Sequence, residues 1–372
     1  MGNTSRWVSI QQEQTPGAII GSPIVMALDS ETLEMKPKIE FVTRSAYSQQ
    51  TASHSYGLPI SGDLVFVAPV PEDLLYCIEA FAGRDTYTFT NNSPVTSASK
   101  HAWNDLSNLA PSTGINVGGS TKPPTKTIKI NYDVNYTLWP SCWATEWRLR
   151  QMVGQPLEAT FSFYSGPSAS GSATPSAAAA ATNATTRNYT RGFGDYSPSI
   201  TSLALPSGQS ATRAFNIFNA FTGGTEISSI FKGLDLRITR QYDTNLFTGG
   251  SRYLVVAQTP GSTMIRGTLT TDLSSAYGAN DIIQDLLAVT ERGIEFAWVG
   301  DAAGISSTKE VLDIQIANLV WSGGMPHMRA NRTPAGYEGQ FTFEAYKAPP
   351  WTSAGLGITV ISGQNGGIAG TL

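Results

Sequence analysis

The chain repeats one pattern of residues at a long interval, and this repetition constrains its architecture more than any other feature. A strand-like run, Gly62–Val67, precedes Pro71-Glu72-Asp73, which opens a short amphipathic helix. The same order returns at Gly267–Leu273, followed by Asn280-Asp281 at the start of a second helix. Self-similarity at a long period is typical of a duplicated structural unit. We therefore expect two related halves.

Two further similarities between the halves support this division. Thr125–Ile130 in the first half resembles Thr308–Asp313 in the second, and an aromatic alternation closes each half, Phe161–Tyr164 and Phe341–Phe343. A chain of 372 residues also exceeds the usual size of a single core. The expected division is a first module at 1–164, a Ser/Ala/Gly-rich connector at 165–198, a second module at 199–347 and a tail at 348–372. The strand candidate Leu356–Ile361 in the tail is expected to pair with a sheet edge of its own chain or of a neighbour.

Short alternating runs between turn formers predict a mainly β fold with antiparallel sheets. Apolar residues at every second position from Ile128 to Leu138 predict one long strand, and Leu312–Val320 repeats this period. Leu234–Ile238 alternates in the same way, with Ile39 and Phe41 as its expected first-half counterpart. Helix is expected at the two amphipathic stripes, the second with Asn280 as its N-cap, and a short helix in the alanine run 177–181 is an alternative for the connector.

The charge balance argues against a protein that binds nucleic acid tightly. With 24 basic and 28 acidic residues the net charge is -4, and no basic stripe is present to neutralise a phosphate backbone. Only 14% of the residues are charged, which suits a subunit that covers much of its surface with partners. A stable secreted β protein with a polar exterior is the alternative. The chain shows no signal peptide and no membrane span, which predicts a soluble protein made in the cytoplasm.

The sequence offers no convergent catalytic groups. The three histidines, His54, His101 and His327, lie apart from one another without metal-ligand spacing. Glu72 and Asp73 are explained by their favourable position at the positive end of a helix. The two Ser-x-x-Lys matches, at 97–100 and 306–309, lack the companion motifs of that enzyme class. We predict no catalytic, cofactor-binding or metal-binding residues and no cofactor, so the chain is expected not to be an enzyme.

The two cysteines and the three clustered tryptophans are interpreted separately. Cys77 and Cys142 are expected to be buried free thiols, because their neighbours are apolar or aromatic. Trp139, Trp143 and Trp147 recur at intervals of four around a proline. Such a cluster either packs a sheet rim or an intersubunit contact, or stacks on sugars or bases. The sequence leaves the role of these tryptophans open.

The opening segment, Arg6–Gly17, resembles the start of tail tube (major tail) proteins of long-tailed bacterial viruses. The resemblance extends over nearly the whole chain through loose motifs, which are Gly62–Leu64, Pro71–Leu75, Ala80–Gly83, Gly154–Phe163, Leu236–Arg240, Gly267–Leu269 and Val311–Trp321. It implies a fold of two tandem tail-tube-like β-sandwich modules, each with one short α-helix. In such proteins the inner sheets form a ring-shaped barrel when the subunits assemble.

The resemblance also implies a function and partners. One-module members of the family form hexameric rings, so a two-module chain is expected to form a homotrimer with pseudo-six-fold symmetry. The rings stack into the tube that conducts the viral genome into the host, and the expected location is the virion, assembled in the bacterial cytoplasm. Expected partners are the chain itself, the tape measure, terminator and baseplate proteins, and DNA that passes without specific binding. No membrane partner is expected.

Positions within such a tube follow from the residues. The polar faces of 126–138 and 309–320 are expected to line the channel, and the polar segments Arg44–Pro59 and Gln241–Gly261 to reach the adjacent ring, a surface loop being the alternative for either segment. Two other functions remain open. A tail terminator or distal tail protein shares the fold but forms a single ring, and a glycan-binding β-sandwich would use the tryptophan cluster.

Overall fold

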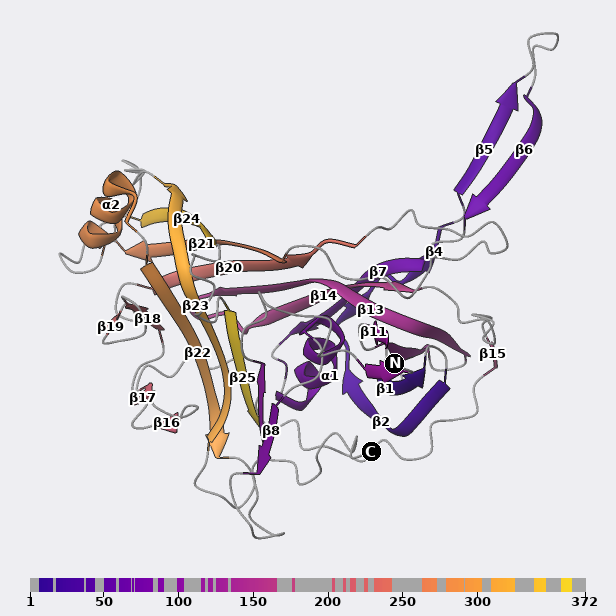
Figure 1. Ribbon diagram of the computed structural model, residues 1–372, viewed down its shortest axis with the longest axis horizontal. Coiled ribbons are helices and arrows are strands. Elements are labelled where there is room, and N and C mark those ends of the chain that lie inside the picture. Colours follow the sequence, from indigo (N-terminus) through magenta and orange to yellow (C-terminus); the bar gives the residue numbers. More distant parts are fainter. Residues whose placement is uncertain are drawn as a thin grey trace, which may run out of the picture.

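The computed structural model describes residues 7–15, 18–36, 38–43, 50–57, 60–67, 69, 71–82, 86–89, 99–103, 115–117, 120–122, 125–132, 135–165, 176–177, 203–204, 210–211, 215–218, 224–226, 231–242, 263–272, 279–290, 292–302, 309–324, 338–345 and 356–362. Strands dominate these residues, and two short helices accompany them, α1 (Pro71–Ala82) and α2 (Ala279–Ala288). The prediction of a mainly β fold is confirmed (Figure 1).

The first part of the chain supplies fourteen of the described strands. They are β1 (Trp7–Thr15), β2 (Ala18–Ala27), β3 (Ser30–Glu31), β4 (Glu34–Met35), β5 (Lys38–Thr43), β6 (Gln50–Gly57), β7 (Ile60–Val67), β8 (Thr86–Phe89), β9 (Ser99–Trp103), β10 (Ile115–Val117), β11 (Ser120–Lys122), β12 (Lys126–Asn131), β13 (Asn135–Met152) and β14 (Glu158–Ser165).

The remaining described strands follow in the second part. They are β15 (Ser176–Ala177), β16 (Leu203–Ala204), β17 (Ser210–Ala211), β18 (Phe215–Phe218), β19 (Gly224–Glu226), β20 (Phe231–Arg240), β21 (Thr263–Asp272), β22 (Arg292–Ala302), β23 (Lys309–Gly323), β24 (Glu338–Ala345) and β25 (Leu356–Ser362).

The strand pairings contain one order twice. In the first part, antiparallel neighbours run β7-β14-β13-β12-β1-β2. In the second part they run β21-β24-β23-β22-β18-β19, also antiparallel throughout. In both parts the first strand of this order leads directly into the helix. The succession of strands along the chain is also the same in the two parts.

The register of the two parts agrees residue by residue. Gly62 lies opposite Phe163 and Leu64 opposite Phe161. In the second part Gly267 lies opposite Phe343, and Leu269 lies opposite Phe341. A β-bulge follows at matching places, between Ala144 and Glu146 in β13 and between Trp321 and Gly323 in β23. The strand runs Gly62–Val67 and Gly267–Asp272 and the two aromatic alternations therefore occupy the same positions in their sheets.

The longest strand pairing between the two parts is that of β13 with β20. β20 lies between β13 and β21, with Glu146 opposite Thr239 at one end of the contact and Met152 opposite Gly233 at the other. Arg240, at the end of β20, lies over the ring of Phe81 in α1, 5.1 Å from its centroid. In the first part, the place beside β7 that corresponds to β20 is held by the short strands β3 and β4.

The long strand β13 changes partners at a fixed corner. Its first half pairs with β12, and its second half pairs with β14 and β20. At the corner, Ser141 has a positive φ of 57°, and its N–H donates to the buried carboxylate of Glu13 at 2.8 Å. The hydroxyls of Thr125 and Thr127 donate to the same carboxylate at 2.6 Å and 2.5 Å. These hydrogen bonds satisfy a buried charge and hold β1, β12 and β13 together.

The helices cover apolar surface. In α1 the predicted stripe of Leu74, Leu75, Ile78 and Phe81 is buried, and the helix packs against β13, β1 and β2. In α2, Ile282 is buried, and the helix contacts β23. Hydrophobic burial of this extent accounts for the stability of a helix as short as α1. In α2, by contrast, Leu287 of the predicted apolar stripe is 73% exposed.

Four sequence-based expectations need correction. The run Ile128–Leu138 is not one strand, because the chain reverses near Tyr132 and forms the β12–β13 hairpin. The echo between Thr125–Ile130 and Thr308–Asp313 does not match the strand order, in which β12 corresponds to β22. The predicted N-cap Asn280 lies inside the first turn of α2. The fourth concerns Ile39 and Phe41, which lie in β5 and not beside β7.

The predicted tail strand pairs with strands of its own chain. β25 pairs with β23 on one side and with β9 on the other. Of the connector 165–198, only Ser165 and the two residues of β15 are described, and β15 pairs with the start of β13. The relation of β15 to β13 is the same as that of β25 to β23.

Candidate functional surface

The three clustered tryptophans pack inside the molecule. Trp139, Trp143 and Trp147 expose 7%, 1% and 0% of their surface. The ring of Trp147 stacks on Phe161 with centroids 5.5 Å apart, and Trp143 stacks on Tyr164 at 6.5 Å. Of the two readings of this cluster, the packing role is therefore the one the structure supports, since a buried ring offers no platform for a sugar.

The other residues that the sequence singled out do not converge. Cys77 and Cys142 are buried free thiols, as predicted, and burial raises the pKa of Cys142. His54 lies in β6 and His101 in β9, whereas His327 is outside the described residues. Within the described part of the chain, no group of three or more His, Cys, Asp or Glu residues is placed to hold a metal ion.

A continuous polar surface in the described residues is the open face of the sheet formed by β7, β14, β13, β20, β21 and β24. Along β14 buried and partly exposed residues alternate strictly, and β24 alternates in the same way. Directly opposite residues share a face, so the cross-strand register identifies the whole set. Its charged and hydroxyl members include Ser61, Asp63, Glu146, Arg148, Arg150, Glu158, Thr160, Ser162, Tyr164, Asp235, Arg237, Thr239, Arg266, Thr268, Asp272, Glu338, Thr342 and Glu344.

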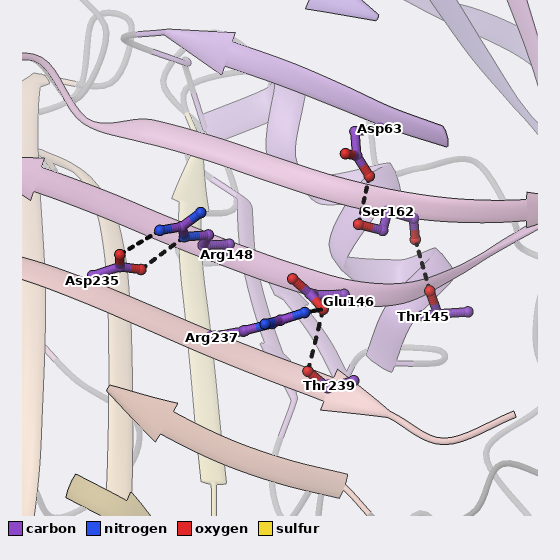
Figure 2. Close-up of polar contacts among 8 residues, drawn as sticks. All are labelled: Asp63, Thr145, Glu146, Arg148, Ser162, Asp235, Arg237 and Thr239. Carbon is purple, nitrogen blue, oxygen red and sulfur yellow. Dashed lines mark hydrogen bonds and ion pairs between the residues drawn. The ribbon is translucent and has the colours of Figure 1, made fainter. Parts of the chain in front are cut away.

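Two ion pairs cross the junction between the two parts of the chain. Arg148 on β13 binds Asp235 on β20 with both ends of its guanidinium, at 2.8 Å from Nε and 2.5 Å from Nη2 (Figure 2). Arg237 on β20 reaches back to Glu146 on β13 at 2.5 Å. Because the two pairs run in opposite directions across one strand contact, they fix the register of β13 against β20.

The bidentate pair affects the charge state of its arginine. The hydrogen bond to Asp235 raises the pKa of Arg148, and partial burial opposes the rise. Arg148 therefore remains a cation at every physiological pH, and its charge is balanced by a carboxylate.

A third pair and a hollow extend this pattern into the second part. Arg266 on β21 lies 3.1 Å from Glu344 on β24. The face has a hollow of about 490 Å³ beside these groups, lined by Arg148, Asp235, Arg237, Arg266, Gly267, Thr268, Ser322, Thr342, Phe343 and Glu344. Each of the three arginines in this lining has a carboxylate partner. The surface thus offers a polyanion few uncompensated positive charges.

Hydroxyl groups continue the face toward β7. Ser162 donates to Asp63 at 2.6 Å, and Thr145 donates to the carbonyl of Ser162 at 3.3 Å (Figure 2). These bonds orient small polar side chains across β7, β14 and β13. The result is a polar wall whose groups already hydrogen-bond to one another.

Within residues 126–138, whose polar face was expected to line the channel, Lys129, Asn131 and Thr137 are partly exposed, and their role there stays a prediction. Lys126 and Thr127 each expose only 1% of their surface, and Lys126 binds Glu79 of α1 at 2.5 Å. The polar face on β13, β20 and β21 was not predicted, although alternation of polar and apolar residues marks each strand. No single-strand signal shows that β13 and β20, about 90 residues apart in sequence, lie side by side.

A second candidate surface is the hairpin of β5 and β6. These strands pair only with each other among the described strands and stand away from the body of the molecule (Figure 1). The hairpin includes part of the polar segment Arg44–Pro59 that was expected to reach a neighbour. Its proposed counterpart is described only at Gln241 and Tyr242.

Among the described residues, no helix has the length and apolar character needed to cross a membrane. No family model matches the sequence, and no curated protein matches it either.

Proposed function

We propose that the chain is a structural subunit of the tail tube of a long-tailed bacterial virus. In this proposal it assembles into stacked rings through which the genome passes into the host cell. It acts in the virion, beside tape measure, terminator and baseplate proteins, and performs no catalysis.

The observation that carries the proposal is the strand order that occurs twice, with the same register at the aromatic pairs. Two similar units in one chain supply two similar positions around a ring. Three chains then imitate six-fold symmetry, and a head-to-tail contact that closes on itself gives a ring instead of an open filament. The resemblance of the sequence to tail tube proteins is consistent with this arrangement.

The mixed-charge face suits the wall of the channel. DNA binding gains most of its non-specific strength when arginine and lysine neutralise phosphates and release counterions. On this face Arg148, Arg237 and Arg266 are already paired with carboxylates. A duplex passing over such a wall meets polar groups without strong phosphate contacts, so it slides without sticking.

The isolated β5–β6 hairpin suits contact with the adjacent ring. A two-stranded hairpin is at best marginally stable alone in water, so an extended one gains stability from a partner. We assign it to the contact between stacked rings. Both proposed roles, wall and arm, concern surfaces that the fold leaves open.

Negative-stain electron microscopy of the purified protein over a range of concentrations tests the proposal. Tubes of uniform width are the expected result. Single rings that never stack would instead favour a tail terminator or distal tail protein, and uniform small particles at all concentrations would contradict both. No observation favours the glycan-binding alternative, because its tryptophans are buried.

A further inference from the structure

Gln12, Glu79 and Lys126 meet beneath α1 in an arrangement that can react. Gln12 on β1 and Lys126 on β12 lie directly opposite each other in the antiparallel register, so their side chains share one face of the sheet. Glu79 belongs to α1, which contacts β1. The proposed function uses none of these three groups.

One carboxylate oxygen holds the nitrogens of both strands. The ammonium of Lys126 donates to Oε2 of Glu79 at 2.5 Å, and the amide Nε2 of Gln12 donates to the same oxygen at 3.0 Å. Nε2 also lies 3.2 Å from Oε1 of Glu79. The amide carbon Cδ of Gln12 is one bond from Nε2, so the shared acceptor keeps it close to the lysine nitrogen.

The surroundings of the ion pair favour its neutral form more than water does. Lys126 exposes 1% of its surface and Glu79 exposes 4%, and the ring of Tyr76 lies 4.9 Å from the lysine nitrogen. Removing two ions from water is costly, and a proton transfer from ammonium to carboxylate leaves two neutral groups. A neutral lysine amine is a nucleophile. Gln12 is partly exposed, which gives a small leaving group a route to solvent.

We propose that Lys126 and Gln12 form an intramolecular isopeptide bond, with Glu79 as the catalytic residue. Glu79 accepts a proton from the Lys126 ammonium, and the neutral Nζ attacks Cδ of Gln12, which forms the new C–N bond. The protonated Glu79 then donates to Nε2, the Cδ–Nε2 bond breaks, and ammonia leaves. Nζ gives up one further proton, which the ammonia carries away as ammonium. Glu79 ends as a carboxylate, and no group is oxidised or reduced.

The position of Glu79 identifies it as the proton carrier and Gln12 as the acceptor. Its carboxylate touches both the attacking nitrogen and the leaving nitrogen. General acid–base catalysis requires a group within hydrogen-bond reach of each proton that it moves. A direct amide between Lys126 and Glu79 would consume that carrier and would expel water instead of ammonia.

The bond would tie β1 covalently to β12. A cross-link between residues far apart in the sequence stabilises a fold mainly by restricting the unfolded chain. The cross-linked protein is therefore expected to melt at a higher temperature than the same chain without the bond. The bond forms within one chain, so it does not depend on what the chain assembles into.

Mass spectrometry of the denatured protein tests the bond. The intact chain is expected to lose the mass of one ammonia molecule, in a fraction that grows as the folded protein is incubated. A tryptic digest is expected to contain one branched peptide, in which the segment with Gln12 is joined to the segment with Lys126. Cleavage after Lys126 is expected to decrease to the same extent, because trypsin requires the free lysine side chain.

Three variants assign the roles. Gln12→Met removes the acceptor amide, keeps the ion pair of Lys126 with Glu79, and is expected to fold without forming the branched peptide. The control Gln11→Met changes the preceding residue, which lies opposite Thr127, and is expected to form the bond as the unmodified protein does. Glu79→Gln removes the proton carrier and is expected to slow bond formation by about 10²-fold or more. Thermal unfolding followed by circular dichroism verifies that each variant is folded.

The outcomes decide the proposal. A folded, unmodified protein that keeps its full mass after prolonged incubation would overturn it, and so would a loss of water in place of ammonia. Ammonia loss that persists in Gln12→Met would place that loss at another residue and would also overturn it. Gln12→Met and Gln11→Met decide these points even where Glu79→Gln, which leaves a buried ammonium without its carboxylate, does not fold.

Discussion

At the scale of single residues, the interior of the first part depends on buried charges that satisfy one another. Lys126 lies beneath α1, where its ammonium binds Glu79 and lies 4.9 Å from the ring centroid of Tyr76. Gln12 donates to the same carboxylate at 3.0 Å. Removing one partner of a buried pair leaves the other charge without compensation, whereas removing both is often tolerated.

Lys126→Met is therefore expected to lower the free energy of unfolding by about 3–5 kcal/mol. The double variant Lys126→Met/Glu79→Leu is expected to recover much of this loss. Urea unfolding followed by tryptophan fluorescence measures both. Lys36→Met is the control, because its pair with Glu34 is solvent-exposed and its removal is expected to leave the midpoint unchanged. Equal stability of Lys126→Met and the unmodified protein would contradict the prediction.

The burial of Cys142 makes the stability of the folded protein depend on pH. Burial raises the pKa of its thiol, and the Sγ donates to the carbonyl of Trp139 at 3.2 Å. The folded state then keeps a proton that the unfolded state loses above about pH 8.5. Stability is fully present below that pH and falls as pH rises, by about 1.4 kcal/mol per pH unit.

Comparison with Cys142→Ala isolates this contribution. Burial also raises the pKa of Tyr242, so the window for the thiol alone lies between about pH 8.5 and 10. Within that window, the unfolding free energy of Cys142→Ala is expected to fall less steeply than that of the unmodified protein. Parallel slopes for the two proteins would show that the Cys142 thiol ionises equally easily in both states.

Among single residues, the local sequence pattern predicted burial correctly only for apolar side chains. The stripe of α1 and the two cysteines are buried as expected. Lys126 begins the range 126–138, whose polar face was expected to line the channel, but it is buried. Its burial depends on Glu79, 47 residues away, and no local pattern reveals such a partner.

At the scale of elements, the hairpin of β5 and β6 is separable from the rest. It forms its own two-stranded sheet, and no described strand outside it pairs with it. Replacing residues 38–57 with a short Gly-Ser linker is expected to leave the thermal midpoint of the body nearly unchanged. The same variant is expected to form rings that do not stack, because it lacks the proposed contact between rings.

Two measurements on one sample decide this prediction. Circular dichroism reports whether the sheet is intact, and electron microscopy reports the assembly. A folded variant that still forms long tubes would remove the hairpin from the contact between rings. A large fall in the thermal midpoint would show instead that the hairpin stabilises its own subunit.

Element-level prediction succeeded where strand and helix signals are local. β7, β21 and the two helices follow from alternation, helical spacing and turn residues. The β12–β13 reversal was missed because the apolar alternation continues across it, in phase from Ile130 to Tyr136. Asn131 and Asn135 flank the reversal, and such residues favour turns. The correspondence of β20 with β3–β4 depends on long-range pairing and is not encoded in either segment alone.

At the scale of the whole molecule, the junction of β13 and β20 makes one continuous sheet of the two parts. Its open face carries Arg148 and Arg237, each held by a carboxylate across the junction. A surface that lets DNA pass needs this neutralisation, because every unpaired arginine adds a phosphate contact. The same two pairs therefore fix the strand register and limit the affinity for a polyanion.

Glu146→Gln/Asp235→Asn removes both carboxylates and leaves both arginines in place. At concentrations below assembly, the variant is expected to bind a fluorescein-labelled DNA duplex more tightly than the unmodified protein does, as measured by anisotropy. If each freed arginine reaches one phosphate, the slope of log K against log salt steepens by about 2. Asp29→Asn removes one carboxylate at an exposed position off this face, and its gain in log K is expected to be less than half that of the double variant. A gain of half or more would mean that only net charge matters, and the face would lose its assignment as the channel wall.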